Sequence, residues 1–291
     1  MSTPRMVLVY RRTQLEVLLE THSTMGAVEF FLGERGQSLA LLQAADAAQR
    51  RAIEEVISVL PATYRLAQVE RENLSRFLFE PDDLIVVVGQ DGLVPNVAKY
   101  VDEQQVVGVS PSAPGVLCTF TPALFSQMLA GEEAAGEKEL VMVEARIDDG
   151  QVLRGLNEVF IGHRSHQSAR YELQWQDRKE FQSSSGLIIG TGTGATGWLA
   201  SLWGQQRPEF SLPGPEEPEL AFFVREAWPS ASSGTSMTSG LVGGQDEIKL
   251  IARSEMVIFA DGMERDCLRV DWGQSIHVRC AQKPLNLLVS V

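Results

Sequence analysis

The sequence predicts an α/β fold in which an N-terminal parallel-sheet α/β domain, residues 1–121, precedes a mainly β C-terminal domain, residues 122–291. Three features predict this arrangement. Strands and helices alternate in the first third of the chain, short strands dominate after about residue 122, and two glycine-containing turns each follow an apolar strand. Alternating strands and helices are typical of a parallel sheet covered by helices.

The N-terminal domain is predicted from one long helix and four short strands. Apolar residues recur near the 3.6-residue period between residues 39 and 60, and Pro61 ends that helix. Short, mostly apolar runs are typical of the central strands of parallel sheets. These runs are residues 6–10, 66–69, 84–88 and 106–109.

The C-terminal domain is predicted from a hairpin and a series of short strands. Residues 140–146 and 152–161 flank an Asp148-Asp149-Gly150 turn, as the two strands of a hairpin would. Residues 205–218 and 229–240, rich in Pro and Glu or in Ser, Thr and Gly, are expected to be exposed, mobile loops. Further strands are expected at 171–175, 220–224, 248–251, 256–260, 276–280 and 285–291, and the last are candidates for packing back on the first domain.

Composition bounds the partners of this 291-residue chain. The net charge of −13 argues against a general nucleic-acid or anionic-membrane surface, although Arg164, Arg170 and Arg225 could form a locally positive pocket. No signal sequence and no apolar run of about 20 residues is present, so a cytoplasmic location is expected. Three widely spaced cysteines, Cys118, Cys267 and Cys280, are expected to be free thiols.

The most informative segment is 186–201. Its apolar strand leads into a loop that alternates glycine with threonine, and a helix-like stretch follows. Such a loop gathers backbone N–H groups and hydroxyls where no bulky Cβ atom intervenes, which suits the phosphate or ribose of a nucleotide. A tight turn without a ligand is the alternative interpretation.

A second turn, Gly89-Gln90-Asp91-Gly92, follows the apolar run 84–88 and precedes a predicted helix. It places Asp91 at the carboxyl end of a strand, where open α/β sheets bind ligands. The alternative is that Asp91 only caps the helix.

Other nucleotide-binding patterns fit poorly. Gly192-x-Gly194-x-x-Gly197 matches the dinucleotide fingerprint of hydride-transfer enzymes, but the acidic residue expected about 20 residues later is missing. Neither glycine turn has the lysine of a P-loop. His163 and His166 lack acidic or cysteine partners at ligand spacing, so no metal-ligating residue is predicted.

Four motifs, taken together, resemble the NAD kinases and their diacylglycerol-kinase-like relatives. In chain order they are Gly89–Gly92, the pair Asn157-Glu158, the Gly/Thr loop Gly190–Trp198, and the Asp261-Gly262 turn. Segments 108–118, 184–187 and 224–226 are most similar to the branch that includes the mitochondrial NAD kinases. The resemblance extends over residues 84–288.

The resemblance implies an enzyme that transfers the γ-phosphoryl group of Mg²⁺-bound ATP, or of polyphosphate in some members, to the 2′-hydroxyl of the adenosine ribose of NAD, giving NADP. It implies that Asp91 receives or orients the hydroxyl proton. Gly89 and Gly92 would let phosphate approach the backbone, and Asn157 and Glu158 would bind ribose or adenine, with a simple β-turn as their alternative. The other implied binding residues are Thr191, Thr193, Gly194, Thr196, Gly197 and Trp198. The resemblance also implies a homodimer or tetramer.

The first motif departs from the family at two positions. Gln90 replaces a glycine, and Leu93 replaces a threonine whose hydroxyl would help to place a phosphate. A sugar or lipid kinase and a catalytically silent nucleotide-binding regulator therefore remain alternatives to an NAD kinase.

Overall fold

The computed structural model describes residues 4–291, which form two compact units. The first unit is the chain up to Tyr100 together with Gln104–Lys138 and Asn286–Val291. The second unit is Val101–Glu103 with Glu139–Leu285. Residues 122–138 thus lie in the first unit rather than the second, because the helix that they begin buries Phe125 in the core of the first unit.

The first unit is built on one sheet with the strand order β2-β1-β3-β4-β18-β5. Neighbouring strands from β2 to β18 pair in parallel, which confirms the parallel-sheet α/β fold expected for this part of the chain. The C-terminal strand β18 enters this sheet beside β4. The strand bounds are β1 Arg5–Tyr10, β2 Arg65–Glu70, β3 Asp83–Val88, β4 Gln105–Val109, β5 Ala135–Leu140 and β18 Leu285–Ser290.

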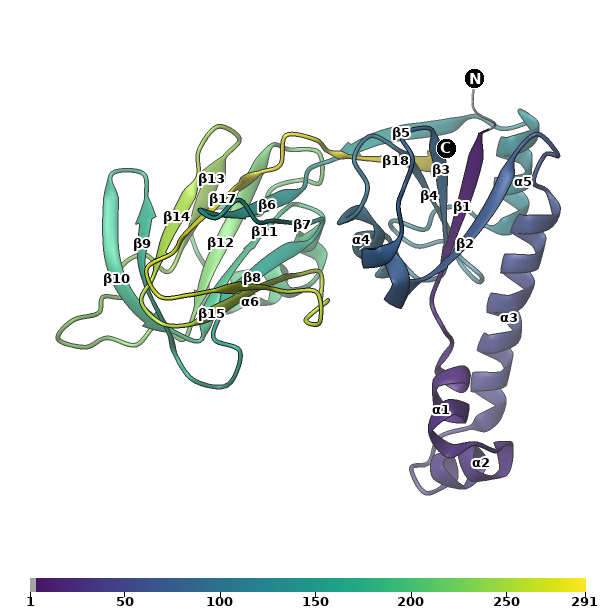
Figure 1. Ribbon diagram of the computed structural model, residues 1–291, viewed down its shortest axis with the longest axis horizontal. Helices are drawn as coiled ribbons and strands as arrows, with labels where there is room; N and C mark the ends of the chain where they lie inside the picture. The colour runs from purple at the N-terminus through teal and green to yellow at the C-terminus, as the bar shows by residue number, and fades with distance from the viewer. Residues whose placement is uncertain (1–3) are drawn as a thin grey trace. The chain divides into compact units, whose positions relative to one another are not determined.

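Helix α3, Leu39–Ser58, covers this sheet with Ala52 and Val56 and confirms the predicted long helix. Beside its N-terminal half lie α1, Gln14–His22, and α2, Met25–Gly33, which share a small core of their own (Figure 1). Thr13 begins α1 with a capping box, in which Glu16 bonds back to the Thr13 amide. The remaining helical elements of this unit are η1 Arg71–Arg76, α4 Leu93–Ala98 and α5 Pro122–Ala130.

The second unit is made of two antiparallel sheets whose facing side chains form one large core. One sheet has the order β10-β9-β14-β17-β6-β7, with bounds Arg178–Ser184, Ala169–Trp175, Ile248–Ala252, Ser275–Cys280, Val143–Ile147 and Val152–Gly155. The other has the order β13-β12-β11-β8-β15-β16, with bounds Ser239–Gly243, Glu219–Arg225, Gly186–Gly190, Glu158–Gly162, Met256–Ala260 and Leu268–Val270. Helix α6, Trp198–Gln206, packs Leu199 and Leu202 on the outer face of the second sheet. The mainly β fold expected here is confirmed.

One predicted strand is in fact two. Residues 152–161 were expected to form the second strand of a hairpin, but the chain leaves the first sheet after Gly155 and joins the second at Glu158. The reason is a contact with a residue that is distant in the sequence. The carboxylate of Asp261 binds the amides of residues 156–158, so these amides are drawn out of the β ladder.

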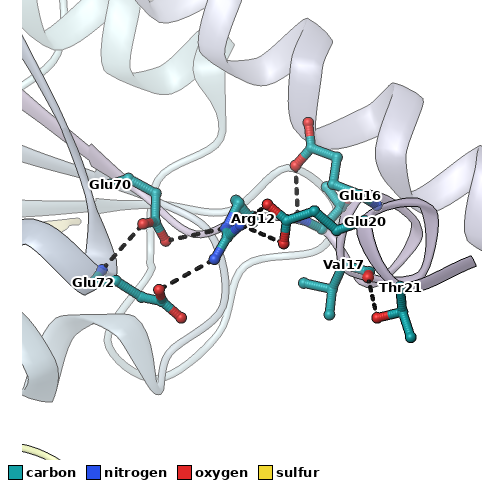
Figure 2. A network of polar contacts seen from close by, with 8 residues as sticks. Arg12, Glu16, Val17, Glu20, Thr21, Glu70 and Glu72 are labelled. Atoms are coloured by element: carbon teal, nitrogen blue, oxygen red, sulfur yellow. Dashed lines mark hydrogen bonds and ion pairs between the residues drawn. The ribbon is translucent and has the colours of Figure 1, made fainter. Parts of the chain in front are cut away.

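Two arginines of the first unit hold carboxylates in very different surroundings. Arg12 follows β1 and lies among Glu20, Glu70 and Glu72 (Figure 2), with all four side chains partly exposed. Arg5 forms two bonds of 2.8 and 2.7 Å to Asp83, whose side chain is only 1% exposed. Screening by water makes the first network weak, whereas the buried Asp83 carboxylate depends on its arginine.

Within residues 4–291, no helix is both long enough and apolar enough to span a membrane.

We predict that Arg5→Met lowers the free energy of unfolding of the first unit by about 3 kcal/mol, because Asp83 is left charged and buried. The control Arg12→Met should lower the free energy of unfolding much less, because water screens the ion pairs of Arg12. Urea unfolding followed by circular dichroism at 222 nm reports mainly the first unit, which holds α1–α5, whereas all the tryptophans lie in the second. Equal losses in the two variants would contradict this ranking.

Candidate functional site

In the first unit, Asp91 lies just after β3 and fastens a neighbouring segment. Its carboxylate accepts hydrogen bonds from the amides of Val116, Leu117 and Cys118 at 2.8, 3.1 and 2.8 Å. A side chain at Gly115 would overlap this carboxylate, so the glycine leaves room for it. Asp91 forms no side-chain cap of α4, and its orientation is fixed by the 116–118 segment instead.

The backbone of this turn offers free donors. The amide of Gly89 bonds to the carbonyl of Val109, but the amides of Gln90, Asp91 and Gly92 donate to no group in residues 4–291. The strand order β2-β1-β3-β4 reverses between β1 and β3, and ligands of open α/β sheets bind at the carboxyl ends of strands beside such a reversal. The turn is therefore well placed to receive an anion.

The two unusual residues of this turn differ in their surroundings. The side chain of Gln90 is exposed and leaves the backbone approachable. Leu93 is 4% exposed, and a Cβ atom at Gly89 would lie 3.2 Å from its Cδ2. Leu93 thus packs under the turn, where a threonine would lose apolar burial.

In the second unit, Asp261 organises residues 156–158. Its carboxylate accepts hydrogen bonds from the amides of Leu156, Asn157 and Glu158 at 2.8, 2.8 and 3.2 Å. In return, the Asp261 amide donates to the carbonyl of Glu158 at 3.2 Å. Asp261 has φ 51°, in the left-handed region that Asp adopts more readily than most residues. Asn157 and Glu158 are therefore held rigidly at the start of β8.

The Gly/Thr loop is fitted onto this same segment. The Thr191 amide donates to the carbonyl of Asn157 at 2.9 Å, and its buried hydroxyl donates to the carbonyl of Leu156. That hydroxyl also accepts from the amides of Thr193 and Gly194. Side chains at Gly190 or Gly194 would overlap the Asn157 carbonyl. The structure therefore brings together the two predicted motifs of this unit, and the hydrogen bonds of Thr191 join them.

The other loop residues divide into buried and exposed. The hydroxyl of Thr193 is buried and makes no hydrogen bond within residues 4–291. Thr196 bonds to the carbonyl of Thr193, and both it and Gly197 are exposed. Trp198 is 36% exposed and stacks on Phe160, with their ring centroids 6.1 Å apart and their planes 11° from parallel.

Burial shifts the proton affinity of Glu158. Its pKa is raised to about 7, first because the side chain is largely removed from water and second because the Asp261 carboxylate is near. Near neutral pH this group can therefore accept a hydrogen bond as a carboxylate or donate one as an acid.

A cavity of about 630 Å³ lies in the second unit beside the loop. Trp198, Arg164 and Arg225 line it, so two of the three arginines expected to form a positive pocket do share one. Arg170 does not line it and lies on β9 in the other sheet.

Sequence reasoning named Asp261 only as part of a turn and did not assign Phe160, Arg265 or Arg269, which lie at this site. For Asp261, the signal was an Asp-Gly pair directly after an apolar strand, which favours a left-handed turn. No sequence signal marks Phe160 or Arg269, because sheet pairing alone brings Phe160 beside Phe259 and Arg269 beside Val257.

No protein-family model and no curated protein matches this sequence. The fold, by contrast, is similar to that of a solved NAD kinase from Archaeoglobus fulgidus in complex with ATP. The TM-score is 0.57 with 16% sequence identity, over 97% of this chain and 92% of that one. The chain therefore has an NAD-kinase-like fold.

Glu158 gives a pH-dependent prediction. Because its folded pKa of about 7 lies above the ordinary 4.5, the stability that it contributes is fully present below about pH 4.5 and is lost as the pH rises through about 7. We expect Glu158→Gln to gain stability relative to wild type between about pH 5 and pH 8, on the order of 2 kcal/mol. Urea unfolding followed by tryptophan fluorescence measures this. Glu264→Gln, an exposed change, is the control, and parallel pH profiles for wild type and Glu158→Gln would contradict the assignment.

Proposed function

We propose that the protein is an ATP-dependent NAD kinase, which phosphorylates the 2′-hydroxyl of the adenosine ribose of NAD to give NADP. The observation that carries the proposal is the interlocking of Asn157-Glu158 with the Gly/Thr loop through Thr191. Two motifs that resemble the NAD kinases thus form one rigid element. The NAD-kinase-like fold and the free amides of Gln90, Asp91 and Gly92 support the same function.

Asp91 is proposed to orient the reacting hydroxyl or to accept its proton. A carboxylate has about four lone-pair positions, and the three amides of residues 116–118 occupy three of them. The hydrogen bonds fix the direction of the remaining position, and fixed geometry is what phosphoryl transfer chiefly requires.

Glu158 and Asn157 are proposed to hold the ribose or adenine of NAD. Above pH 7 the Glu158 carboxylate would accept hydrogen bonds from ribose hydroxyls, which are worth about 1.5–3 kcal/mol each to a charged acceptor. Thr191 would act indirectly, by fixing the loop whose exposed residues, Thr196, Gly197 and Trp198, face the ligand.

Mg²⁺ is proposed to arrive with ATP. Residues 4–291 hold no group of three His, Cys, Asp or Glu side chains that would form a protein cage for a metal. Mg²⁺ is commonly bound through substrate phosphates and water with one or two carboxylates. It would neutralise charge on the transferred phosphoryl group.

The test is to incubate the purified protein with Mg-ATP and NAD and to assay NADP enzymatically. We expect turnover by wild type and a loss of at least about 100-fold in kcat for Asp91→Asn. Gly115→Ala is the matched control, because it crowds the same carboxylate but keeps its charge. A smaller loss in Gly115→Ala would point to the carboxylate itself rather than to the loop that it fastens.

Near-normal activity of Asp91→Asn would remove Asp91 from the chemistry. No phosphoryl transfer by wild type to NAD, with nucleotide still bound, would favour the silent regulator that the departures at Gln90 and Leu93 leave open. Transfer to a sugar or lipid hydroxyl instead of NAD would favour the related kinases.

A further inference from the structure

The outer face of one sheet in the second unit is basic, although the protein is acidic. This sheet has the order β10-β9-β14-β17-β6-β7, and alternate residues of its strands point away from the core that it shares with the other sheet. Only two of these outward residues, Glu144 and Glu172, are acidic. The basic ones are Arg146, Arg154, Arg170, Lys179, Lys249, Arg253 and Arg279. Across the whole chain the balance is the opposite, with 38 Asp and Glu against 25 Lys and Arg.

This basic face is open to solvent in the described part of the chain. Its outward residues are exposed or half-buried, except Glu144, which is 3% exposed. The Glu144 carboxylate lies among three guanidinium groups, those of Arg146, Arg154 and Arg279, at 3.5, 3.3 and 3.4 Å. One carboxylate carries one negative charge, so a surplus of positive charge is left even around the most buried acid of the face.

Three other basic side chains have no partner. Within residues 4–291, the side chains of Arg170, Lys179 and Lys249 form no ion pair and no hydrogen bond. Arg253 lies directly opposite Arg170, since its amide donates to the Arg170 carbonyl at 2.8 Å. Like charges opposite each other on neighbouring strands are unfavourable, and Arg253 has only a loose ion pair of 3.6 Å, with Glu172. This arrangement favours an anionic partner.

The basic residues form three rows across the strands. These rows are Arg170–Arg253, Lys179–Lys249–Arg146 and Arg279–Glu144–Arg154. Because neighbouring strands are about 4.8 Å apart, the rows spread the charge over a broad patch and not along one track. A single strand of nucleic acid would follow one row, and a duplex would curve away from the outer ones. A plane of anionic groups can meet all three rows at once.

An exposed tryptophan lies at the rim of the basic face. Trp272 is 69% exposed, and the Arg253 guanidinium lies 5.8 Å from its ring centroid. The next residue, Gly273, donates its amide to the carbonyl of Ala252 at 2.9 Å, which holds this turn beside the end of β14. Tryptophan is enriched at membrane–water interfaces, where one part of the ring is apolar and the N–H is solvated. The rim thus adds an interfacial anchor to the positive charge.

We propose that the basic face binds the surface of a lipid bilayer that contains anionic lipids. The net charge of −13 predicts the opposite, but it treats the charge as evenly spread. At physiological salt, exposed charges more than about 8 Å apart are largely screened from each other, so the residues at the contact decide the attraction. The cavity beside Trp198 and the Gly/Thr loop belong to the other sheet and its connections. Membrane binding is therefore separate from the proposed function.

The test is co-sedimentation of the full-length protein with vesicles of phosphatidylcholine, alone or mixed with phosphatidylserine. We expect binding to the mixed vesicles only, with release as the salt is raised toward 1 M, where the Debye length falls to about 3 Å. Each basic residue near an anionic bilayer adds about fivefold to binding. The triple variant Arg170→Gln, Lys179→Gln and Lys249→Gln should therefore bind the mixed vesicles at least about 20-fold more weakly.

The matched control removes three exposed and unpaired charges from the first unit. It is the triple variant Arg51→Gln, Arg76→Gln and Lys138→Gln, which should bind like wild type. All six positions carry surface side chains without partners, so neither variant is expected to unfold, and circular dichroism verifies this. The single variant Trp272→Ala should bind more weakly while keeping its preference for the mixed vesicles.

Three results would overturn the proposal: no binding to the mixed vesicles, equal binding to both kinds of vesicle, or undiminished binding by the triple variant of the basic face. Tighter binding of duplex DNA or single-stranded RNA than of vesicles, lost in the same variant, would overturn it in favour of a nucleic-acid surface. None of these readings involves NADP formation, so this proposal and the proposed function can each fail without the other.

Discussion

The hydrogen bonds from three consecutive amides to the carboxylate of Asp261 are the constraint on which the second unit's candidate site depends. These amides belong to the crossing from one sheet to the other, where no β ladder can satisfy them. Because residues 156–158 are fixed, the carbonyls of Leu156 and Asn157 are in place to accept hydrogen bonds from Thr191. The glycines of the loop can then approach the Asn157 carbonyl closely. The positions of Glu158, Phe160 and Trp198 follow from that fit.

The first unit uses the same device. Asp91 binds the amides of residues 116–118 as Asp261 binds those of 156–158, and in the second unit Glu180 binds the amides of Ser236 and Met237. In each case a carboxylate, rather than a backbone carbonyl of a helix or strand, accepts the hydrogen bonds of loop amides. Such charge-assisted hydrogen bonds are stronger than those between neutral groups. Rigid loops at the ends of strands are what a site that must position phosphate and ribose needs. The buried, unbonded hydroxyl of Thr193 is the exception in the loop, and its burial costs stability.

Much of the fold and part of the candidate site could be predicted from the sequence, and the predictions that were wrong have physical causes. The central strands and the helix at residues 39–60 were predictable because burial imposes a pattern on them. The prediction of a single strand over 152–161 was wrong after Gly155. The carboxylate of Asp261, more than 100 positions away in the sequence, accepts hydrogen bonds from the amides of residues 156–158. The hydroxyl of Thr191 is buried in hydrogen bonds to the backbone, which the spacing of the motif could not reveal, and the predicted contact of this residue with a nucleotide stays a prediction. Only two of the four arginines that line the cavity were predicted, Arg164 and Arg225. Arg269 reaches the cavity because β16 pairs with β15, which places it opposite Val257, and Arg265 reaches it from the turn before β16.

The most direct test of this account is amide hydrogen exchange, resolved by NMR, in wild type and Asp261→Asn. Loss of the charged acceptor should speed exchange at Leu156, Asn157 and Glu158 by roughly 30-fold, which corresponds to about 2 kcal/mol. The account predicts that the amides of Thr191, Thr193 and Gly194 lose protection with them, because those residues are bonded to the same segment. If the loop amides kept their wild-type protection while those of 156–158 lost theirs, the Gly/Thr loop would not depend on Asp261, and the central claim would be contradicted.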